Sequence, residues 1–329
     1  MKVAVYYANN DIKIEDIPVP RIQDGEILVK VMASGICGTD VMEWYRIKKA
    51  PRILGHEIAG EIVESRSPRY RTGQRVFVSH HVPCNTCKYC LTDNHTACSA
   101  LHQGNYDPGG YSEFVRVPKE NVEHGTYLLP ETVSYEEGTM IEPLACAVRA
   151  QRLIGITEGQ TVLVLGSGVS GLTNIALAKL KGARVVATDI DEYRLGKARE
   201  WGADEVINAS QQIDIKADRI IICTGAQAAV RQAFQSIDRK GIILLFAVGP
   251  ETIQLPTQEF WRNELRIESS YGAAPRDLEE ALDLITKKQV AVADLITHTL
   301  PLTEIQKAFQ IVASAKESLK VVLLPFPSE

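Results

Sequence analysis

The stretch Thr161-Val-Leu-Val-Leu-Gly-Ser-Gly-Val-Ser-Gly171 decides the fold of this chain. It begins with an apolar run, 161–165, which is typical of a strand buried on both faces. Glycines spaced Gly-x-Gly-x-x-Gly follow, and residues 172–180 are rich in Leu, Ala and Ile and contain no proline. The pattern predicts a strand, a tight turn and a helix, and a second apolar run at 184–188 completes a βαβ unit.

The glycine-rich turn has the spacing of a dinucleotide-binding site. Gly166 would form the tight turn, Gly168 would admit a pyrophosphate to the backbone, and Gly171 would let the helix pack closely on the strand. The first helical residues, Val169 and Ser170, would offer free N–H groups and a partial positive charge to the phosphates. An ordinary tight loop is the alternative for such a motif alone, but the strand, the helix and the acid that follows favour the binding site.

That acid is Asp189, which ends the second strand about 20 residues after the glycines, where the residue that binds an adenosine ribose belongs. Its carboxylate would accept hydrogen bonds from a free 2′-hydroxyl and repel a 2′-phosphate. The sequence therefore favours NAD over NADP. Arg194 lies close by in sequence and can soften this preference.

Length and composition bound the remaining possibilities. A chain of 329 residues suggests two domains. The formal net charge of −5, without a basic or acidic block, argues against nucleic acid or an anionic membrane as a partner. No apolar run approaches the roughly 20 residues that span a bilayer, and the N-terminal residues enter a strand pattern without a signal peptide. We therefore expect a cytoplasmic protein.

The first part of the chain carries possible zinc ligands. Residues 1–33 read as short strands, and the glycine-flanked loop after them contains Cys37, Thr39 and Asp40. His56 and Glu57 follow within a Gly-His-Glu-x-x-Gly segment. Cys, His and Glu are ligand types of zinc, and an open fourth position distinguishes a catalytic zinc from a structural one. Taken singly, the thiol and the imidazole are equally compatible with packing roles.

A cluster of cysteines gives a more specific signal. Four of the seven cysteines are Cys84, Cys87, Cys90 and Cys98. At this spacing they can enclose one tetrahedral zinc as thiolates, which leaves no position for a substrate. Because the loop is otherwise polar, its metal would act as a staple. An adventitious cysteine cluster or an iron centre is the alternative.

These motifs, in this order, resemble the zinc-containing medium-chain alcohol and polyol dehydrogenases over essentially the whole chain. The resemblance rests on the segments 37–40, 55–60, 84–98 and 166–171. It implies an α/β protein with two domains. The first is a GroES-like, β-rich catalytic zinc-binding domain, formed by residues 1–143 and 277–329. The second is an NAD-binding Rossmann domain, residues 144–276, whose alternating strands and helices predict a doubly wound parallel sheet.

The resemblance also implies residue roles. Zinc would be held by Cys37, His56 and a glutamate, either Glu57 or Glu142, with water as the remaining ligand. Segment 141–144, Ile-Glu-Pro-Leu, resembles the sorbitol dehydrogenase branch. The resemblance thus implies two zinc ions for each chain, a catalytic one at this group and a structural one at the four clustered cysteines.

Further roles concern protons and phosphates. By the same resemblance, Thr39 would accept the alcohol proton and Asp40 would orient His56. Relatives often carry a histidine at the position of Met42, where it is the last residue of a proton relay. That residue is absent here. Lys320 matches a basic pyrophosphate-binding position, for which a solvated surface lysine is the alternative.

The implied reaction moves hydride from a secondary alcohol of a polyol or vicinal diol to NAD and gives a ketone. A threonine 3-dehydrogenase-like or sugar-phosphate dehydrogenase is the alternative within the family. A redox-inactive NAD-binding sensor is the alternative outside enzymes. Family members pair through the edge of the cofactor sheet. The segment Leu265–Tyr271 is therefore expected to lie at the interface of a homodimer or homotetramer.

Overall fold

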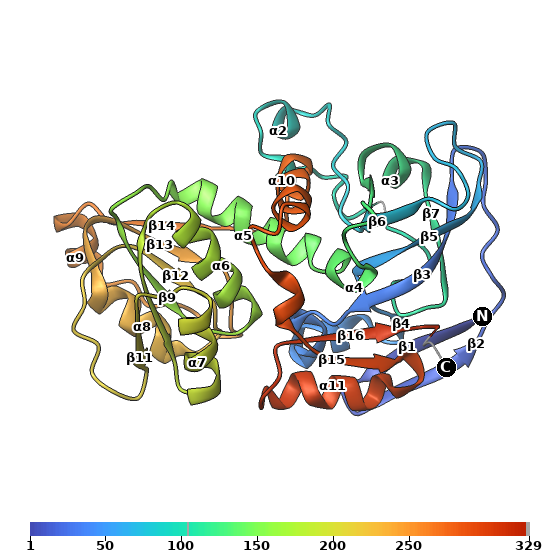
Figure 1. The fold of residues 1–329 in the computed structure, drawn as a ribbon. Helices are drawn as coiled ribbons and strands as arrows, with labels where there is room; N and C mark the ends of the chain where they lie inside the picture. The colour runs from blue at the N-terminus through green and yellow to red at the C-terminus, as the bar shows by residue number, and fades with distance from the viewer. Residues whose placement is uncertain (104, 327–329) are drawn as a thin grey trace. The chain divides into compact units, whose positions relative to one another are not determined.

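The computed structural model describes residues 1–103 and 105–326, which divide into two compact units (Figure 1). The first unit contains residues 1–145 and the described residues from 273 onward, and the second contains residues 146–272. The chain therefore leaves the first unit once and returns to it. The sequence-based boundaries, 143/144 and 276/277, lie close to these junctions. Helix α5 (Ile141–Ile154) crosses the first junction.

The first unit is mostly β-structure. Its strands are β1 (Lys2–Ala8), β2 (Asp11–Asp16), β3 (Ile27–Gly35), β4 (Arg52–Ile53), β5 (Glu57–Ser65), β6 (Arg75–Ser79), β7 (Phe114–Val117), β8 (Thr126–Leu128), β15 (Ile296–Pro301) and β16 (Lys320–Leu324). The larger sheet has the order β15-β16-β3-β5-β6-β8, and β7 pairs with β3 beside it. A smaller sheet has the order β2-β1-β4.

Short helices connect these strands. The α-helices of the first unit are α1 (Glu43–Arg46), α2 (Lys88–Leu91), α3 (Lys119–His124), α4 (Tyr135–Gly138), α10 (Pro275–Thr286) and α11 (Ile305–Ser314). The 3₁₀ helices are η1 (Gly38–Val41), η2 (Ile47–Lys49), η3 (His95–Ala97), η4 (Val292–Leu295) and η5 (Leu302–Glu304). No helix in the described ranges is long and apolar enough to cross a membrane.

The second unit is built on a parallel sheet. Its strands are β9 (Thr161–Leu165), β10 (Arg184–Asp189), β11 (Glu205–Asn208), β12 (Ala217–Ile222), β13 (Ile237–Leu245) and β14 (Arg266–Ser269). Its helices are α6 (Val169–Leu180), α7 (Glu192–Glu200), α8 (Gln227–Ser236) and α9 (Thr257–Arg262). The strand order is β11-β10-β9-β12-β13-β14, and every pairing is parallel.

This order confirms the predicted doubly wound sheet. The chain builds outward from β9 in one direction through β10 and β11, and then in the other through β12, β13 and β14. The direction reverses between β9 and β12, and the crevice at the carboxyl ends of such neighbouring strands is where open α/β sheets bind ligands. The glycine turn follows β9 at this edge.

Strands β9 and β10 have the predicted bounds. Strand β5 begins at Glu57, opposite Gly35 of β3, so its pairing with β3 includes Gly60. Strand β11 was missed, because its short, mostly half-buried sequence carries little alternation.

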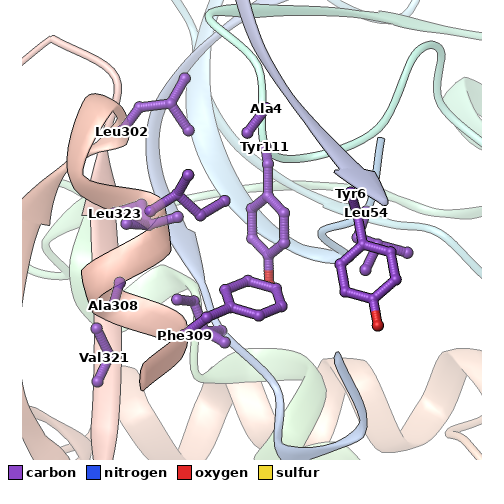
Figure 2. Packing of buried hydrophobic residues seen from close by; sticks show 11 residues of the cluster. Ala4, Tyr6, Leu54, Tyr111, Leu302, Ala308, Phe309, Val321 and Leu323 are labelled. Atoms are coloured by element: carbon purple, nitrogen blue, oxygen red, sulfur yellow. The ribbon is translucent and has the colours of Figure 1, made fainter. Parts of the chain in front are cut away.

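An aromatic cluster anchors the first unit (Figure 2). The Phe309 ring of α11 packs near both Tyr6 and Tyr111, with ring centroids 6.1 Å and 6.0 Å away. Leu323 of β16 belongs to the same buried cluster. The returning C-terminal segment therefore completes a hydrophobic core that residues near the N-terminus begin, and Tyr111 connects this core to the site described next.

Candidate metal and dinucleotide sites

Strand register brings the possible zinc ligands of the first unit together. Strands β3 and β5 pair antiparallel with Gly35 opposite Glu57, so the loop after β3 meets the residues that begin β5. One ligand atom each from Cys37, His56 and Glu57 all lie within 4.8 Å of one another. We call this group the strand-end site. Its donors are a thiol, an imidazole and a carboxylate, which together suit zinc.

Glu57 is the buried carboxylate of this site. Its side chain is 1% exposed, and Lys320 Nζ donates a hydrogen bond to its Oε2 atom. A Cβ atom at Gly35 would overlap the Glu57 carboxylate, so a larger residue there would displace the Glu57 and Lys320 side chains. The Lys320 ammonium, which the sequence assigned to a pyrophosphate, is 3% exposed and engaged in this ion pair within the first unit.

Asp40 lies at the centre of the hydrogen bonds around the site and is fully buried. Its Oδ2 atom accepts from Tyr111 Oη at 2.6 Å and from the Cys37 backbone at 3.3 Å. Its Oδ1 atom accepts from Arg46 Nη2 at 2.9 Å and lies 3.5 Å from His56 Nδ1. These contacts place Asp40 where it can fix the orientation of the imidazole ring, the kind of partner that metal-binding histidines need.

The electrostatics of His56 follow from these neighbours. Burial disfavours a charged imidazole, but the charges of Asp40 and Cys37 outweigh it and raise the pKa of His56 to about 10. Burial and the Asp40 carboxylate hold the pKa of Tyr111 well above its usual range, so its hydroxyl remains a donor. A bound metal ion replaces the imidazole proton, since histidine binds metals in its neutral form.

Thr39 lies on η1 beside the thiol. Its hydroxyl donates to Cys37 Sγ at 3.2 Å and its backbone N–H to the same sulfur at 3.4 Å. The Oγ1 atom also accepts a hydrogen bond from Arg46 Nη2 at 2.9 Å. The hydroxyl is therefore held next to the possible metal ligands, where the sequence placed it. The contact with Arg46 was not foreseen.

A row of histidines that sequence reasoning missed adjoins the strand-end site. Strand β6 pairs with β5, with Ser79 opposite Glu57, so the next residue, His80, lies beside His56 with ring centroids 4.8 Å apart. His81 stacks on His80 at 3.7 Å, and its Nε2 atom is 3.1 Å from His102 Nδ1. The adjacent pair His80 and His81, shortly before the cysteine cluster, was the available signal.

Burial favours the neutral form of His80 and His81. Burial, followed by the neighbouring imidazoles, holds the pKa of His80 well below its usual range. Burial and His102 lower the pKa of His81 to about 3. His80 and His81 therefore add polar, uncharged rings to the surroundings of the site.

Glu142 lies in the first turn of α5. Burial and then the charges of Glu142 and Glu57 raise the pKa of Tyr106, which places both carboxylates within electrostatic reach of one buried ring. Within the described part of the chain, the group of close ligand atoms at the strand-end site includes Glu57 and not Glu142. The choice between the two glutamates as a zinc ligand stays a prediction.

The four clustered cysteines form a second group, the cysteine lobe, residues 84–98. Their sulfur atoms lie within 4.8 Å of one another, with separations of 3.5 Å for Cys87–Cys90, 3.5 Å for Cys84–Cys98 and 4.0 Å for Cys84–Cys90. Tetrahedral zinc with bonds of about 2.3 Å requires sulfurs about 3.8 Å apart. The donor set and its spacing therefore fit a zinc ion.

The lobe also favours thiolates in part. Hydrogen bonds from Thr86 and from backbone N–H groups lower the pKa of Cys84 to about 5, whereas burial raises the pKa of Cys90 to about 12. The cysteines are free thiols rather than disulfides. A metal ion would supply the charge that stabilises the remaining thiolates.

The glycine turn of the second unit has the conformation that its sequence requires. Gly166 has a φ of +95°, and a Cβ atom there would lie 3.2 Å from the Cys223 carbonyl oxygen of the neighbouring chain segment. A Cβ atom at Gly171 would overlap the Gly166 carbonyl, so the third glycine permits close helix packing. Gly168 caps α6, whose first residues are Val169 and Ser170. The turn thus presents a helix N-terminus at the carboxyl edge of the sheet.

Asp189 stabilises the same turn through hydrogen bonds to the backbone. Its Oδ2 atom accepts from the Ser167 backbone at 2.8 Å, and its Oδ1 atom accepts from the Asp191 backbone at 3.0 Å. Asp189 is 8% exposed, and its two hydrogen bonds hold the backbone on both sides of the strand end in place. Arg194 lies near Gly168, where a Cβ atom would be 3.8 Å from its Nη1 atom.

Family models match most of both units. The alcohol dehydrogenase GroES-like domain matches residues 23–127, and the zinc-binding dehydrogenase model matches residues 170–287. The chain is also 32% identical over 345 residues to a sorbitol dehydrogenase from Halalkalibacterium halodurans, with 98% of each protein covered.

Solved structures of dehydrogenases have the same fold as this chain. The 2R,3R-butanediol dehydrogenase from Bacillus subtilis matches with a TM-score of 0.86 and 26% identity over 99% of each chain. An alcohol dehydrogenase from Escherichia coli, complexed with the cofactor NADH, matches with a TM-score of 0.88 and 30% identity over 98% of this chain and 99% of that one. The predicted combination of a GroES-like domain and a doubly wound sheet is confirmed.

Proposed function

The chain belongs to the zinc-containing medium-chain alcohol and polyol dehydrogenase family, and from this premise we propose its reaction. It oxidises a secondary alcohol of a polyol or vicinal diol to a ketone, transfers hydride to NAD⁺ and releases the proton to solvent. The observation that carries the proposal is the grouping of Cys37, His56 and Glu57 within 4.8 Å at the ends of β3 and β5.

The residues of the strand-end site would hold the catalytic zinc. With zinc bound by these residues, the site would supply Lewis-acid chemistry that lowers the pKa of a substrate hydroxyl. Asp40 keeps the His56 ring oriented, and Tyr111 keeps Asp40 oriented through the 2.6 Å hydrogen bond. Thr39 presents its hydroxyl next to Cys37, within reach of a substrate oxygen at this site. Glu142 is the alternative to Glu57 as the carboxylate ligand, with water as the remaining ligand.

The second unit would bind the dinucleotide. The N-terminus of α6 faces the pyrophosphate, with Gly166, Gly168 and Gly171 providing the close approach. Asp189 would accept hydrogen bonds from the ribose, which favours NAD, and Arg194 supplies a positive charge nearby. The NADH-bound relative supports this cofactor.

The cysteine lobe would hold a structural zinc. Its four sulfurs complete a tetrahedral shell and leave no position for a substrate. Two zinc ions for each chain, one in each group, are part of the proposal.

The substrate class rests on the relatives. The matched proteins act on sorbitol and on 2R,3R-butanediol, according to their names, and both compounds carry adjacent hydroxyl groups. Threonine and sugar phosphates are the competing classes, and a redox-inactive NAD sensor is the alternative without turnover.

The test is NAD⁺ reduction by zinc-loaded protein over a panel of simple alcohols, vicinal diols, polyols, sugar phosphates and threonine. Turnover that favours diols or polyols supports the proposal. Turnover confined to threonine or a sugar phosphate replaces the substrate class, and NAD binding without any turnover favours the sensor. His124→Ala is a matched control for His56→Ala, because His124 is a half-exposed histidine far in sequence from both groups.

Assembly and location complete the proposal. Strand β14 ends the sheet of the second unit, its residues are exposed, and Trp261 and Tyr271 beside it are 82% and 51% exposed. A second copy pairing along this edge would cover them and give a homodimer or homotetramer. A reducing, cytoplasmic location suits the free cysteines, and neither nucleic acid nor membrane is a proposed partner. Light scattering would give the oligomeric state.

A further inference from the structure

Arg46 reaches back from the end of α1 onto the loop that carries the strand-end site. Its Nε atom donates to the Thr39 carbonyl at 3.0 Å. Its Nη2 atom donates both to Thr39 Oγ1 and to Asp40 Oδ1, each at 2.9 Å. The Arg46 side chain is 18% exposed and the Asp40 carboxylate is fully buried, whereas the two bonds to Thr39 lie at the surface. One guanidinium thus fixes the backbone, the hydroxyl and the carboxylate of a single turn.

The chemistry of arginine makes this arrangement directional. A guanidinium is always charged, carries five N–H donors and has no acceptor. The Thr39 hydroxyl can therefore accept a hydrogen bond from Arg46 but can pass no proton to it. Its own hydrogen must turn away from Arg46, and it is directed to Cys37 Sγ at 3.2 Å. That direction is the side of the possible metal ligands.

Met42 is a poor acceptor for the proton of the Thr39 hydroxyl. Met42 occupies the place of the relay histidine of relatives, and a thioether sulfur is only a weak acceptor. The Met42 backbone N–H donates to the Thr39 carbonyl at 3.4 Å rather than to the hydroxyl. The Thr39 hydroxyl itself accepts from Arg46, which presents a hydrogen atom to it, the opposite of what an outward proton relay needs.

We propose that Arg46 is a positioning residue that holds Thr39 as a hydrogen-bond donor toward the reacting oxygen of the substrate. This inference rests on the proposed alcohol dehydrogenase function. The Thr39 hydroxyl then stabilises the negative charge on the oxygen from which hydride leaves, as preorganised donors do in oxyanion sites. The Arg46 charge strengthens that donor, because a hydroxyl that accepts from a cation gives up its own hydrogen bond more readily.

The test is a double-mutant cycle between position 46 and position 39, with kcat and KM measured on the best alcohol of the panel. Arg46→Met should lower kcat by about 10- to 100-fold, the range for a residue that orients a reacting group, and change KM less. Arg46→Lys should recover part of the loss, because it keeps the charge. In a Thr39→Val background the same Arg46→Met change should have little further effect, since the two residues act as one unit.

Lys49→Met is the matched control, because Lys49 is an exposed cation three residues away on η2. It should leave kcat within about twofold, as expected for a surface substitution away from the site. Zinc content and thermal stability of all variants show whether the fold and both metal groups persist.

A readout independent of turnover uses trifluoroethanol, an acidic alcohol that resists oxidation. Calorimetry on the zinc-loaded protein with NAD⁺ should give about tenfold weaker binding in Arg46→Met and unchanged binding in Lys49→Met. Equal losses from Arg46→Met in the wild-type and Thr39→Val backgrounds would overturn the inference, because Arg46 would then act only through Asp40. A wild-type protein without any turnover would overturn the proposed function and this inference together, whereas normal turnover in Arg46→Met would overturn the inference alone.

Discussion

The cysteine lobe and the strand-end site are both thiol-containing groups in the first unit, yet the fold builds them in opposite ways. The lobe takes all its sulfurs from one segment, 84–98, and its buried cluster contains little beyond Cys90, Cys98 and Leu101. The strand-end site draws on two segments, and the register of β3 against β5 brings them together.

This difference implies a structural role for a metal in the lobe and a chemical role for a metal in the strand-end site. The lobe has little core of its own, so a metal there would supply its folding free energy. The strand-end site is held by a buried sheet and by hydrogen bonds to Asp40, so it should keep its shape without metal. A metal there would supply chemistry rather than structure.

The largest expected effect is on turnover when the strand-end thiol is removed. Cys37→Ser should lower kcat/KM by at least about 1000-fold, because Lewis-acid stabilisation of charge is worth several kcal/mol. The thermal midpoint should stay within a few degrees of wild type, since the surrounding sheet is intact. Steady-state kinetics and a thermal scan check both statements. Cys146→Ser is the control for loss of a thiol outside both groups.

The next effect is on stability when the lobe loses a sulfur. Cys98→Ser should destabilise the first unit by more than about 3 kcal/mol, the scale for loss of a metal ligand. The first thermal transition should therefore fall by about 5 to 10 °C. If Cys98→Ser melts like wild type, the lobe does not depend on its metal and the contrast between the two groups fails.

A chelator should remove the metal of the strand-end site faster than the metal of the cysteine lobe. The proposed strand-end site would keep an open position beside the exposed Thr39, whereas the four sulfurs of the lobe would enclose their metal, with Cys90 and Cys98 buried. Incubation with a chelator should therefore abolish turnover at least about tenfold faster than it lowers the thermal midpoint. Simultaneous loss of both properties would contradict the distinction.

The smallest effect sharpens the description of the strand-end site. Tyr111→Phe removes the hydroxyl that donates to buried Asp40, so it should cost about 1–3 kcal/mol of stability. It should also lower kcat by about tenfold, through a less well oriented His56. Tyr127→Phe, a half-buried tyrosine of β8, provides the control. Unchanged kinetics would show that Asp40 is held without Tyr111.

Local signals in the sequence were sufficient for much of this account. The run 161–171 predicted strand, turn and helix because apolar period, glycine conformation and helix start all lie within a few residues. The cysteine lobe was equally readable, since all its ligands share one segment. Cys37 and His56 were selected by residue type, and the resemblance supplied their pairing.

Contacts that depend on strand register were not readable. Lys320 meets Glu57 because β16 and β5 both pair with β3, and nothing local in either segment indicates that meeting. His80 lies beside His56 for the same reason, through the pairing of β6 with β5. Arg46 resembled one more surface cation in a basic segment, and only its folded position shows the hydrogen bonds to Thr39.

The most direct test of the central claim is the zinc content of purified wild-type, Cys37→Ser and Cys98→Ser proteins by elemental analysis. The account predicts two zinc ions for each wild-type chain and one for each variant, with the zinc of Cys37→Ser retained in a folded but inactive protein. Two zinc ions retained in Cys37→Ser would contradict the account, because the strand-end site would then hold its metal without the thiol on which the proposed chemistry depends.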